Sequence, residues 1–205
     1  MLVDRLYYPV TTLGPGKRIV VWTCGCTRHC PGCANPELWE ARLEAALPNE
    51  RLAALLLDLA ARTGAHRLTF TGGDPLEQAD DLAEVLAAVR SAFDDVLVYT
   101  GFVLEHGTPP LGSGPLSPSD TRWRLPASLA PLIDVIIDGP YVAALNDGRC
   151  GLRGSTNQRV VVLSPHLENL YHEEEKKPRR IQNAVFDGRA LSIGIHGRPP
   201  KEEQR

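Results

Sequence analysis

The amino-acid sequence predicts a single α/β domain built on parallel strands, folded as a partial (incomplete) βα barrel or an open sheet. Short β-branched runs alternate along the chain with segments in which leucine and valine recur at helical spacing, a pattern typical of βαβ units. The chain has 205 residues, of which 43% are hydrophobic, so it can bury one substantial core. It is short for a closed eight-stranded barrel, which takes about 250 residues.

These runs place the expected helices and strands along the chain. We expect one helix after Asn35-Pro36, a second from Asn49 to Gly64, and a third with Asp74 as its N-cap and Glu77 completing a capping arrangement. The residues expected to form buried stripes are Leu52, Leu55, Leu56 and Leu59 in the second helix and Leu82, Val85, Leu86, Val89 and Phe93 in the third. Strands are expected at 18–22, 67–71, 96–100, 133–137, 158–163 and, with a weaker pattern, 190–195.

Two segments interrupt this alternation. Residues 107–126 are rich in glycine, proline and serine, which predicts a long surface loop. Residues 164–182 are polar and charged, which is typical of a solvated face, and we assign them no function. We therefore divide the chain into a partial-barrel domain at 1–163 and a segment at 164–205, which holds the charged stretch, a C-terminal strand and a polar tail packed on the same domain.

Composition and charge exclude several classes of protein. The formal net charge is −3, from 22 basic and 25 acidic residues, and gives no electrostatic footprint for nucleic acid. No apolar run approaches the roughly 20 residues needed to cross a bilayer, and the N-terminal residues lack a charged-then-apolar signal pattern. We therefore expect a cytoplasmic protein that binds neither nucleic acid nor membrane.

Four of the five cysteines crowd into the segment from Cys24 to Cys33. In a reducing cytosol such crowding indicates a metal or redox site rather than disulfides. Cys26, Cys30 and Cys33 have the spacing C-x3-C-x2-C, so three thiolates on one loop can each hold one iron of a cubane cluster. The fourth iron then keeps an open coordination position.

Two other metal sites remain as alternatives. A zinc knuckle would add Cys24 as a fourth ligand, although only one residue separates it from Cys26. A two-iron ferredoxin site would need C-x4-C-x2-C and a distant fourth cysteine, for which Cys150 is the candidate. We leave Cys24 and Cys150 out of the ligand set and expect them to be small buried or half-buried thiols.

Four glycine-containing motifs follow predicted strands. They are the cysteine loop, Thr71-Gly72-Gly73-Asp74, Tyr99-Thr100-Gly101-Phe102 and Asp138-Gly139-Pro140. The carboxyl ends of parallel strands gather on one side of an α/β fold, where ligands bind. The sequence therefore predicts a single site formed by these four motifs.

The motifs also carry a family resemblance. Gly25-Cys26-Thr27-Arg28-His29-Cys30-Pro31-Gly32-Cys33, followed by Thr71-Gly72-Gly73-Asp74-Pro75-Leu76 and Asp138-Gly139-Pro140, resembles the radical S-adenosylmethionine superfamily. Within it, the chain is most similar to the glycyl radical enzyme activases, and among these to the activating proteins of anaerobic ribonucleotide reductase. The similarity spans most of residues 10–163.

This resemblance implies a function and a set of site residues. It implies a partial βα barrel with a [4Fe-4S] cluster on Cys26, Cys30 and Cys33, whose open iron is chelated by the methionyl amine and carboxylate of S-adenosylmethionine. The reduced cluster would cleave that cofactor to a 5′-deoxyadenosyl radical, which abstracts a hydrogen atom. Besides the cluster, the resemblance implies no catalytic side chain. The implied cofactor-binding residues are Gly72, Gly73 and Asp74, which match the segment that holds the methionyl amine, together with Thr71, Tyr99, Asp138, Gly139 and Asn157.

The resemblance also implies partners, namely a glycyl radical enzyme such as anaerobic ribonucleotide reductase and a reductant such as flavodoxin or ferredoxin. Three features depart from the family pattern: the long 107–126 segment, the additional residues 164–205, and a cysteine at position 24. Two alternatives therefore remain beside the activase. One is a radical S-adenosylmethionine enzyme that acts directly on a peptide or small molecule, and the other is a zinc-binding module without catalysis.

Overall fold

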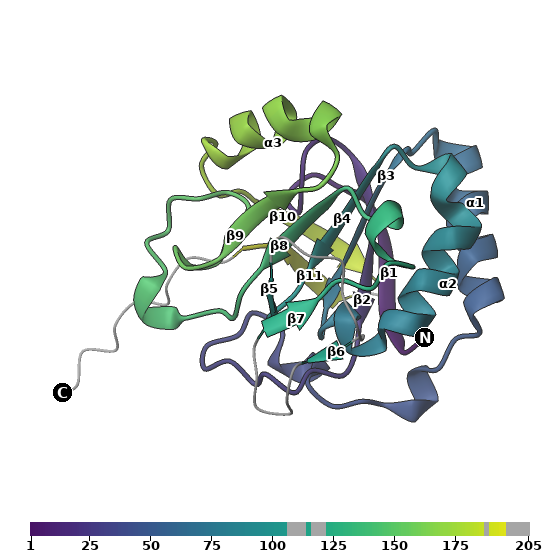
Figure 1. Ribbon diagram of the computed structural model, residues 1–205, viewed down its shortest axis with the longest axis horizontal. Coiled ribbons are helices and arrows are strands. Elements are labelled where there is room, and N and C mark those ends of the chain that lie inside the picture. The colour runs from purple at the N-terminus through teal and green to yellow at the C-terminus, as the bar shows by residue number, and fades with distance from the viewer. Residues whose placement is uncertain (106–113, 116–121, 187–188, 196–205) are drawn as a thin grey trace.

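A computed structural model describes residues 1–105, 114–115, 122–186 and 189–195. Its centre is a six-stranded sheet in the order β1-β2-β3-β4-β8-β9 (Figure 1). The strands are β1 (Val3–Val10), β2 (Arg18–Thr23), β3 (Arg67–Gly72), β4 (Asp95–Tyr99), β8 (Val135–Asp138) and β9 (Arg159–Val162). In the described chain the sheet is open, with β1 and β9 at its edges. The protein is therefore a mixed α/β domain.

The direction of the strands only partly matches the prediction. Strands β2, β3, β4 and β8 are parallel, as expected. Strand β9 is antiparallel to β8, so the expectation of a parallel strand at 158–163 is wrong. No helix long enough to cross the sheet lies between these two strands, and a parallel connection would need such a crossover. Strand β1, which the sequence analysis did not identify, pairs antiparallel with β2.

Helices α1 (Asn49–Thr63) and α2 (Ala79–Val89) lie side by side over one face of the sheet (Figure 1). Helix α1 ends at Gly64, whose φ of 69° is a left-handed conformation that glycine adopts without strain. Leu55 is 47% exposed, contrary to expectation, because the buried stripe of α1 is centred on Leu52, Leu56 and Ala60. The helix expected after Asn35 is only a short 3₁₀ turn, Pro36–Leu38.

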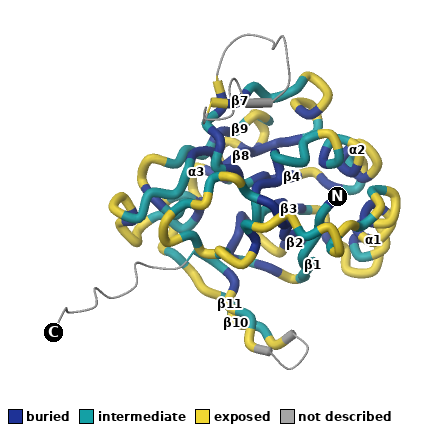
Figure 2. Tube along the Cα trace, turned by 90° about the horizontal axis from the view of Figure 1, so that it is seen from below, coloured by how far each residue is buried: buried dark blue, intermediate teal, exposed yellow. Residues whose placement is uncertain are grey.

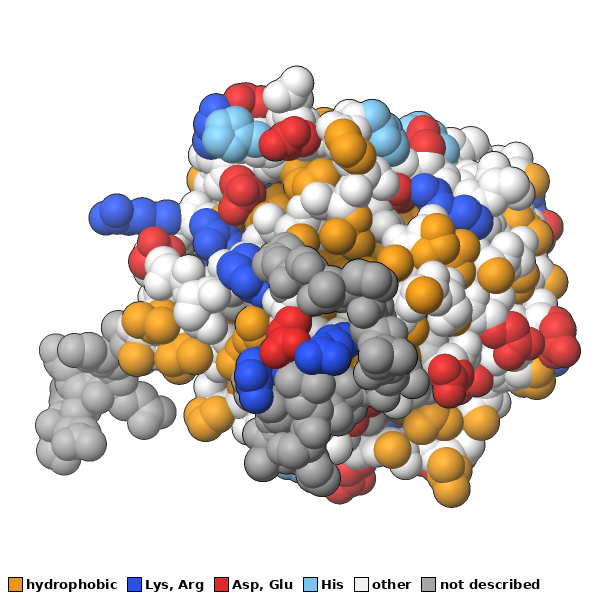
Figure 3. Space-filling view, viewed as in Figure 1, with side chains coloured by type: hydrophobic (Ala, Val, Ile, Leu, Met, Phe, Trp, Pro, Cys, Tyr) orange, Lys and Arg blue, Asp and Glu red, His pale blue; other side chains and the backbone are white. Residues whose placement is uncertain are grey.

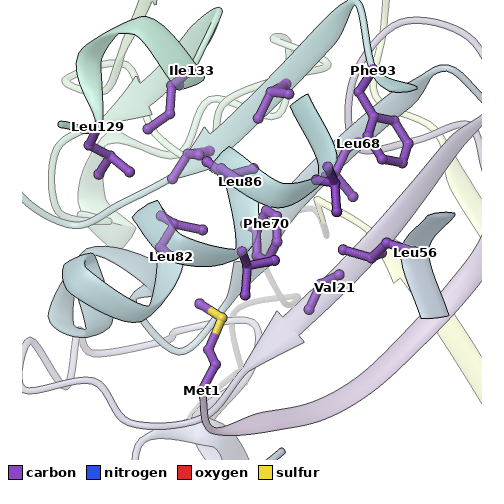
Figure 4. Packing of buried hydrophobic residues seen from close by; sticks show 14 of the residues in the cluster. Met1, Val21, Leu56, Leu68, Phe70, Leu82, Leu86, Phe93, Leu129 and Ile133 are labelled. Atoms are coloured by element: carbon purple, nitrogen blue, oxygen red, sulfur yellow. The ribbon is translucent and has the colours of Figure 1, made fainter. Parts of the chain in front are cut away.

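The largest hydrophobic core lies between these two helices and the sheet (Figure 4). It contains alternate residues of the central strands, for example Leu68 and Phe70 of β3, packed against Leu56 of α1 and Leu82 and Leu86 of α2. On the other face, two smaller clusters are centred on Trp22 and on Leu97. Side chains therefore fill the space between the two helices and the sheet, which leaves the opposite face of the sheet for a site.

The C-terminal region packs on that opposite face. Helix α3 (Glu168–Glu175) places the hydroxyl of Tyr171 within 2.7 Å of the buried Asp95 carboxylate, to which it donates a hydrogen bond. Strands β10 (Ile181–Phe186) and β11 (Arg189–Gly194) form a separate antiparallel hairpin, so the strand expected near 190–195 exists outside the main sheet. Figure 2 shows this hairpin extending from the body of the protein.

The segment 107–126 is described only in part. Short strands β5 (Val103–Leu104), β6 (Gly114–Pro115) and β7 (Arg122–Arg124) form a small sheet, while 107–113 and 116–121 lie outside the described residues. Trp123 is buried, with its ring 6.1 Å from that of Phe102. The prediction of a surface loop is therefore wrong for the β7 part of the segment.

The described residues show no surface gathered by charge and no membrane-spanning helix, in agreement with the composition. On the face seen in Figure 3, acidic and basic side chains are interspersed rather than gathered by sign. Within the described part of the chain, no helix has the length and apolar character of a membrane span.

Candidate cluster and cofactor site

The cysteine loop leaves the end of β2 and is fixed by backbone hydrogen bonds. The amide of Gly25 donates to the Leu38 carbonyl at 2.9 Å, and the amide of Cys26 donates to the Trp39 carbonyl at the same distance. The Asp74 amide donates to the Gly25 carbonyl at 2.8 Å. A Cβ atom on Gly73 would lie 2.4 Å from that carbonyl oxygen, so glycine at 73 allows the end of β3 to pack directly on the loop.

Glu77 also holds the cysteine loop. Its Oε1 atom accepts hydrogen bonds from the Thr27 amide at 2.7 Å and the Thr27 hydroxyl at 2.6 Å. The expectation that Glu77 completes a capping arrangement with Asp74 is therefore wrong. The Asp74 amide is already bound to Gly25, so it does not need Glu77 as an acceptor.

The three candidate ligands share one environment. Cys26, Cys30 and Cys33 are each half-exposed, and none of the five cysteines forms a disulfide. The Asn35 amide donates a hydrogen bond to the sulfur of Cys33 at 3.4 Å. The backbone amides of Arg28 and His29 lower the pKa of Cys26, and that of Tyr141 lowers the pKa of Cys30, which partly offsets the larger effect of burial. Amide donors of this kind stabilise sulfurs that carry the negative charge of a bound cluster.

Burial, followed by the charge of Asp74, raises the pKa of the Cys26 thiol to about 12. Burial also raises the pKa of Cys30. Metal binding must therefore displace these thiol protons.

The other two cysteines differ from this set. Cys24 is fully buried in the apolar cluster around Trp22, and Cys150 is half-buried, which confirms both expectations. In the described residues, no three His, Cys, Asp or Glu side chains are arranged as ligands of a single ion. A closed four-cysteine zinc site would need Cys24 to leave the core.

A cavity of about 420 Å³ opens beside this loop. Trp22, Thr71 and Tyr99 line it. Tyr99 is the last residue of β4, Trp22 and Thr71 are the next-to-last residues of β2 and β3, and their side chains lie on the same face of the sheet. That face is the one opposite α1 and α2, because Val21, Phe70 and Val98 belong to the large core. The cysteine loop, the segment after β8 and the hairpin complete the lining, with Arg5, Leu13, Gly32, Cys33, Ala34, Asn35, Tyr141, Gly154, Gln158 and Leu191 to Ile195.

Thr71 and Tyr99 are thus the predicted cofactor residues that line this cavity. Gly72 and Gly73 pack against the backbone of Thr23 and Gly25 and do not line the cavity. Asp74, which follows them, does not line it either. The Asp74 carboxylate accepts hydrogen bonds from Leu76 N at 3.1 Å, Thr100 Oγ1 at 2.9 Å and Gly101 N at 2.8 Å. It therefore caps the turn before α2, as expected, and joins the ends of β3 and β4. Burial raises the pKa of this carboxyl to about 7 against the effect of its donors.

The remaining predicted positions are also outside the cavity lining. Asp138 is buried and accepts from the Leu104 amide at 2.8 Å and from the Arg159 guanidinium. Gly139 has a φ of 101° in the turn that follows, and Asn157 Nδ2 donates to the Pro140 carbonyl at 2.8 Å. These residues shape the segment after β8, which brings Tyr141 to the cavity.

Several lining residues were not singled out from the sequence. Arg5 lies on β1, whose sequence does not alternate between apolar and polar residues, and its guanidinium is 5.3 Å from the centre of the Trp22 ring. Tyr141 follows the Asp-Gly-Pro turn, which was a usable signal. The hairpin residues reach the cavity through contacts with the first strands, and no local pattern indicates these contacts.

The hydroxyl of Tyr99 is buried and has no hydrogen-bond partner among the described residues. Burial raises its pKa, and the charges that act on it are those of Arg18, Cys150 and Glu174, so the hydroxyl lies away from the cysteine loop. The fit to an iron–sulfur cluster therefore rests on the donor set, which is three thiols on one loop.

Comparison with known proteins agrees with this geometry. The model of the family described as "4Fe-4S single cluster domain" matches residues 12–161. The chain belongs to this family, and more particularly to that of the anaerobic ribonucleoside-triphosphate reductase-activating proteins. It is 32% identical to the one from Salmonella typhimurium and 33% identical to the one from Pasteurella multocida, in each case over 75% of this chain, and it covers 94% and 93% of those proteins.

Two further similarities complete the comparison. The chain is 30% identical to the anaerobic ribonucleoside-triphosphate reductase-activating protein of Enterobacteria phage T4, over 78% of this chain and 93% of that protein. Among solved structures, QueE from Escherichia coli matches with a TM-score of 0.42 and 16% identity, covering 66% of this chain and 68% of that one. The resemblance to radical S-adenosylmethionine activases is confirmed by the sequence relatives.

Proposed function

We propose that this protein is a radical S-adenosylmethionine activase that installs a glycyl radical on an anaerobic ribonucleoside-triphosphate reductase. The observation that carries the proposal is the loop of three half-exposed thiols beside a cavity at the ends of parallel strands. When bound, a reduced [4Fe-4S] cluster supplies the electron that cleaves S-adenosylmethionine to methionine and a 5′-deoxyadenosyl radical, which takes a hydrogen atom from a glycine of the partner.

The chain's own residues have distinct tasks in this proposal. Cys26, Cys30 and Cys33 hold the cluster, and the amides bonded to their sulfurs stabilise its charge. Tyr99 and Thr71 line the cavity from the sheet, and the apolar side chains of the lining exclude water from the cofactor. Gly72, Gly73 and Asp74 remain the expected segment for the methionyl amine, and they also fix the cysteine loop from behind.

The partner enzyme, the electron donor and the location of the protein are part of the same proposal. The relatives are named for activating the reductase, and this chain covers more than nine-tenths of their length. We regard the open sheet as the incomplete barrel expected from the sequence, with its open side accessible to a protein loop. A one-electron donor such as flavodoxin or ferredoxin and a cytoplasmic location fit five thiols that form no disulfide.

The experiment that tests this function uses the full chain, reconstituted anaerobically with iron and sulfide. It is mixed with S-adenosylmethionine, dithionite and the anaerobic ribonucleoside-triphosphate reductase of the same organism. We expect electron paramagnetic resonance to detect a glycyl radical on the reductase, and no radical when S-adenosylmethionine is omitted. Release of 5′-deoxyadenosine without any radical on the reductase would instead support direct action on a peptide or small molecule.

Replacing Tyr99 with phenylalanine should affect stability and leave cofactor affinity unchanged. The variant Tyr99→Phe removes a buried hydroxyl that has no partner among the described residues, so the free energy of unfolding of the cluster-free protein should stay equal or rise, by up to about 1 kcal/mol. The dissociation constant for S-adenosylmethionine should equal that of the wild type, because the charges near the hydroxyl are those of Arg18, Cys150 and Glu174 and not those of the cysteine loop. Denaturant unfolding and anaerobic equilibrium dialysis measure the two effects, and a dissociation constant raised about fivefold would show that the hydroxyl contacts the cofactor.

A further inference from the structure

We propose that the β10–β11 hairpin is a fixed wall of the cofactor cavity, and that its apolar inner edge binds the nucleoside half of S-adenosylmethionine. This inference rests on the proposed function. The hairpin lies beyond residue 161, where the match to the family model ends. Even so, five consecutive residues, Leu191 to Ile195, contribute to the lining of the cavity beside Cys33.

The hairpin is attached to the turn between β1 and β2 through both of its strands. On β11, the Ile193 carbonyl accepts a hydrogen bond from the buried Thr12 hydroxyl at 3.1 Å. On β10, the Gln182 side chain accepts from the Thr11 amide at 3.0 Å and donates to the Pro9 carbonyl at 2.7 Å. Gln182 and Ile193 are paired across the hairpin, so these bonds hold the same face of both strands against the protein.

That inner face is also fixed by apolar packing. Ile193 is 2% exposed and belongs to the cluster of Leu13 and Trp22, against which Leu191 and Ile195 are partly buried. The outer face is different, since Val185 of β10 is 76% exposed. A hairpin with one buried and one solvated face is a permanent part of the wall.

The same C-terminal segment also fixes the opposite wall. Just before β10, the Arg179 guanidinium donates to the side chain of Asn146 at 2.6 Å and to the carbonyl of Gly154 at 2.9 Å. Gly154 lines the cavity. Gly194 packs against the backbone of Arg180, since a Cβ at 194 would be 2.5 Å from the Arg180 carbonyl oxygen. The φ of Gly194, 142°, also favours glycine. Both walls therefore depend on residues beyond the family match.

The chemistry of the lining indicates which half of the cofactor meets the hairpin. Leu191, Ile193 and Ile195 have no polar side-chain atoms and cannot satisfy an ammonium or a carboxylate. With Leu13 and Trp22 they form an apolar surface, whereas Asn35, Thr71 and Gln158 on the other elements carry donors and acceptors. S-adenosylmethionine has a charged amino-acid half and a nucleoside half with flat apolar ring faces. The apolar surface of the hairpin fits the nucleoside half.

The test compares Leu191→Ala and Ile193→Ala with Val185→Ala, an apolar residue on the outer face of the same hairpin. Full-length reconstituted proteins are dialysed anaerobically, without reductant, against S-adenosylmethionine, 5′-deoxyadenosine or methionine. For the two inner variants we expect the dissociation constants of S-adenosylmethionine and 5′-deoxyadenosine to rise about tenfold, because each loses buried methylene contacts. Methionine affinity and iron content should equal those of the wild type, and Val185→Ala should bind all three ligands normally.

The possible outcomes separate the two claims. If the wild type binds S-adenosylmethionine and both inner variants bind it equally well, the hairpin is not part of the nucleoside site and the inference is overturned, while the proposed function stands. A wild type that holds the cluster but binds no S-adenosylmethionine contradicts the proposed function, and the inference with it. If Ile193→Ala melts at a much lower temperature than the wild type, Leu191→Ala alone decides whether the hairpin binds the nucleoside half, because Leu191 is only half-buried.

Discussion

Replacing Cys30 with alanine is expected to abolish cluster assembly and, with it, all cleavage of S-adenosylmethionine. Cys30 is the middle of the three half-exposed thiols, and its sulfur receives the amide of Tyr141 from the segment after β8. With only two thiolates, the loop cannot hold three irons of a cubane cluster. The iron content and the absorbance of reconstituted protein should fall to background, and no 5′-deoxyadenosine should form.

A matched control is Cys150→Ala, which removes a half-buried thiol outside the loop. It should retain the iron content and turnover of the wild type. Unfolding curves of the cluster-free proteins should also coincide for Cys30→Ala and the wild type, because a half-exposed side chain contributes little to packing. Wild-type iron content in Cys30→Ala would refute the assignment of this ligand.

Replacing Arg18 with alanine is expected to cause the largest loss of stability, about 3–5 kcal/mol in the free energy of unfolding. Arg18 starts β2 with a fully buried side chain, and its Nη1 atom lies 2.6 Å from the carboxylate of the equally buried Asp95 at the start of β4. It also donates to the Thr69 hydroxyl at 2.6 Å and the Leu68 carbonyl at 2.7 Å. Removing the guanidinium leaves a buried carboxylate without its main partner, which is the costly case.

Two variants show whether this loss comes from the unpaired charge. Tyr171→Phe removes one hydrogen bond to Asp95 and should cost only about 1–2 kcal/mol. The double variant Arg18→Met/Asp95→Leu removes both charges and should be more stable than Arg18→Ala. Chemical denaturation of cluster-free protein measures all three. A loss below about 1 kcal/mol in Arg18→Ala would contradict the assigned role of the pair.

The parallel centre of the fold could be predicted because its signals are local. The β-branched runs that became β2, β3, β4 and β8 stand next to turn motifs, and Asp74 caps the following turn as its position suggested. The cysteine spacing was equally local. The place of Thr71 and Tyr99 at the cavity follows from strand geometry, since both lie near the carboxyl ends of parallel strands.

Other parts depend on contacts that the local sequence does not encode. The direction of β9 depends on the path of the segment after β8, and the strand period is the same in either direction. Two apolar residues, Leu38 and Trp39, were too few to continue a helix beyond the turn after Asn35. The hairpin reaches the cavity through bonds between Gln182 and Pro9 or Thr11, which are more than 170 residues away.

The hydrogen-bond partners of two acidic residues could not be predicted from the sequence either. Asp74 was expected to cap the turn and to hold the methionyl amine, and its bonds to Thr100 and Gly101 could not be predicted from the sequence. Glu77 was expected to cap a helix, and instead it holds Thr27 of the cysteine loop. Both residues stand where two motifs meet, so their partners are set by tertiary packing rather than by propensity.

The central claim is that three thiolates in one loop leave an iron open to S-adenosylmethionine. The most direct test is to reconstitute the full chain anaerobically, reduce it with dithionite, add S-adenosylmethionine and measure 5′-deoxyadenosine by chromatography. The account predicts a brown protein with about four irons per chain that releases the deoxynucleoside, and a Cys30→Ala protein that releases none. A colourless protein with stoichiometric zinc, or a four-iron protein that never releases 5′-deoxyadenosine, would contradict it.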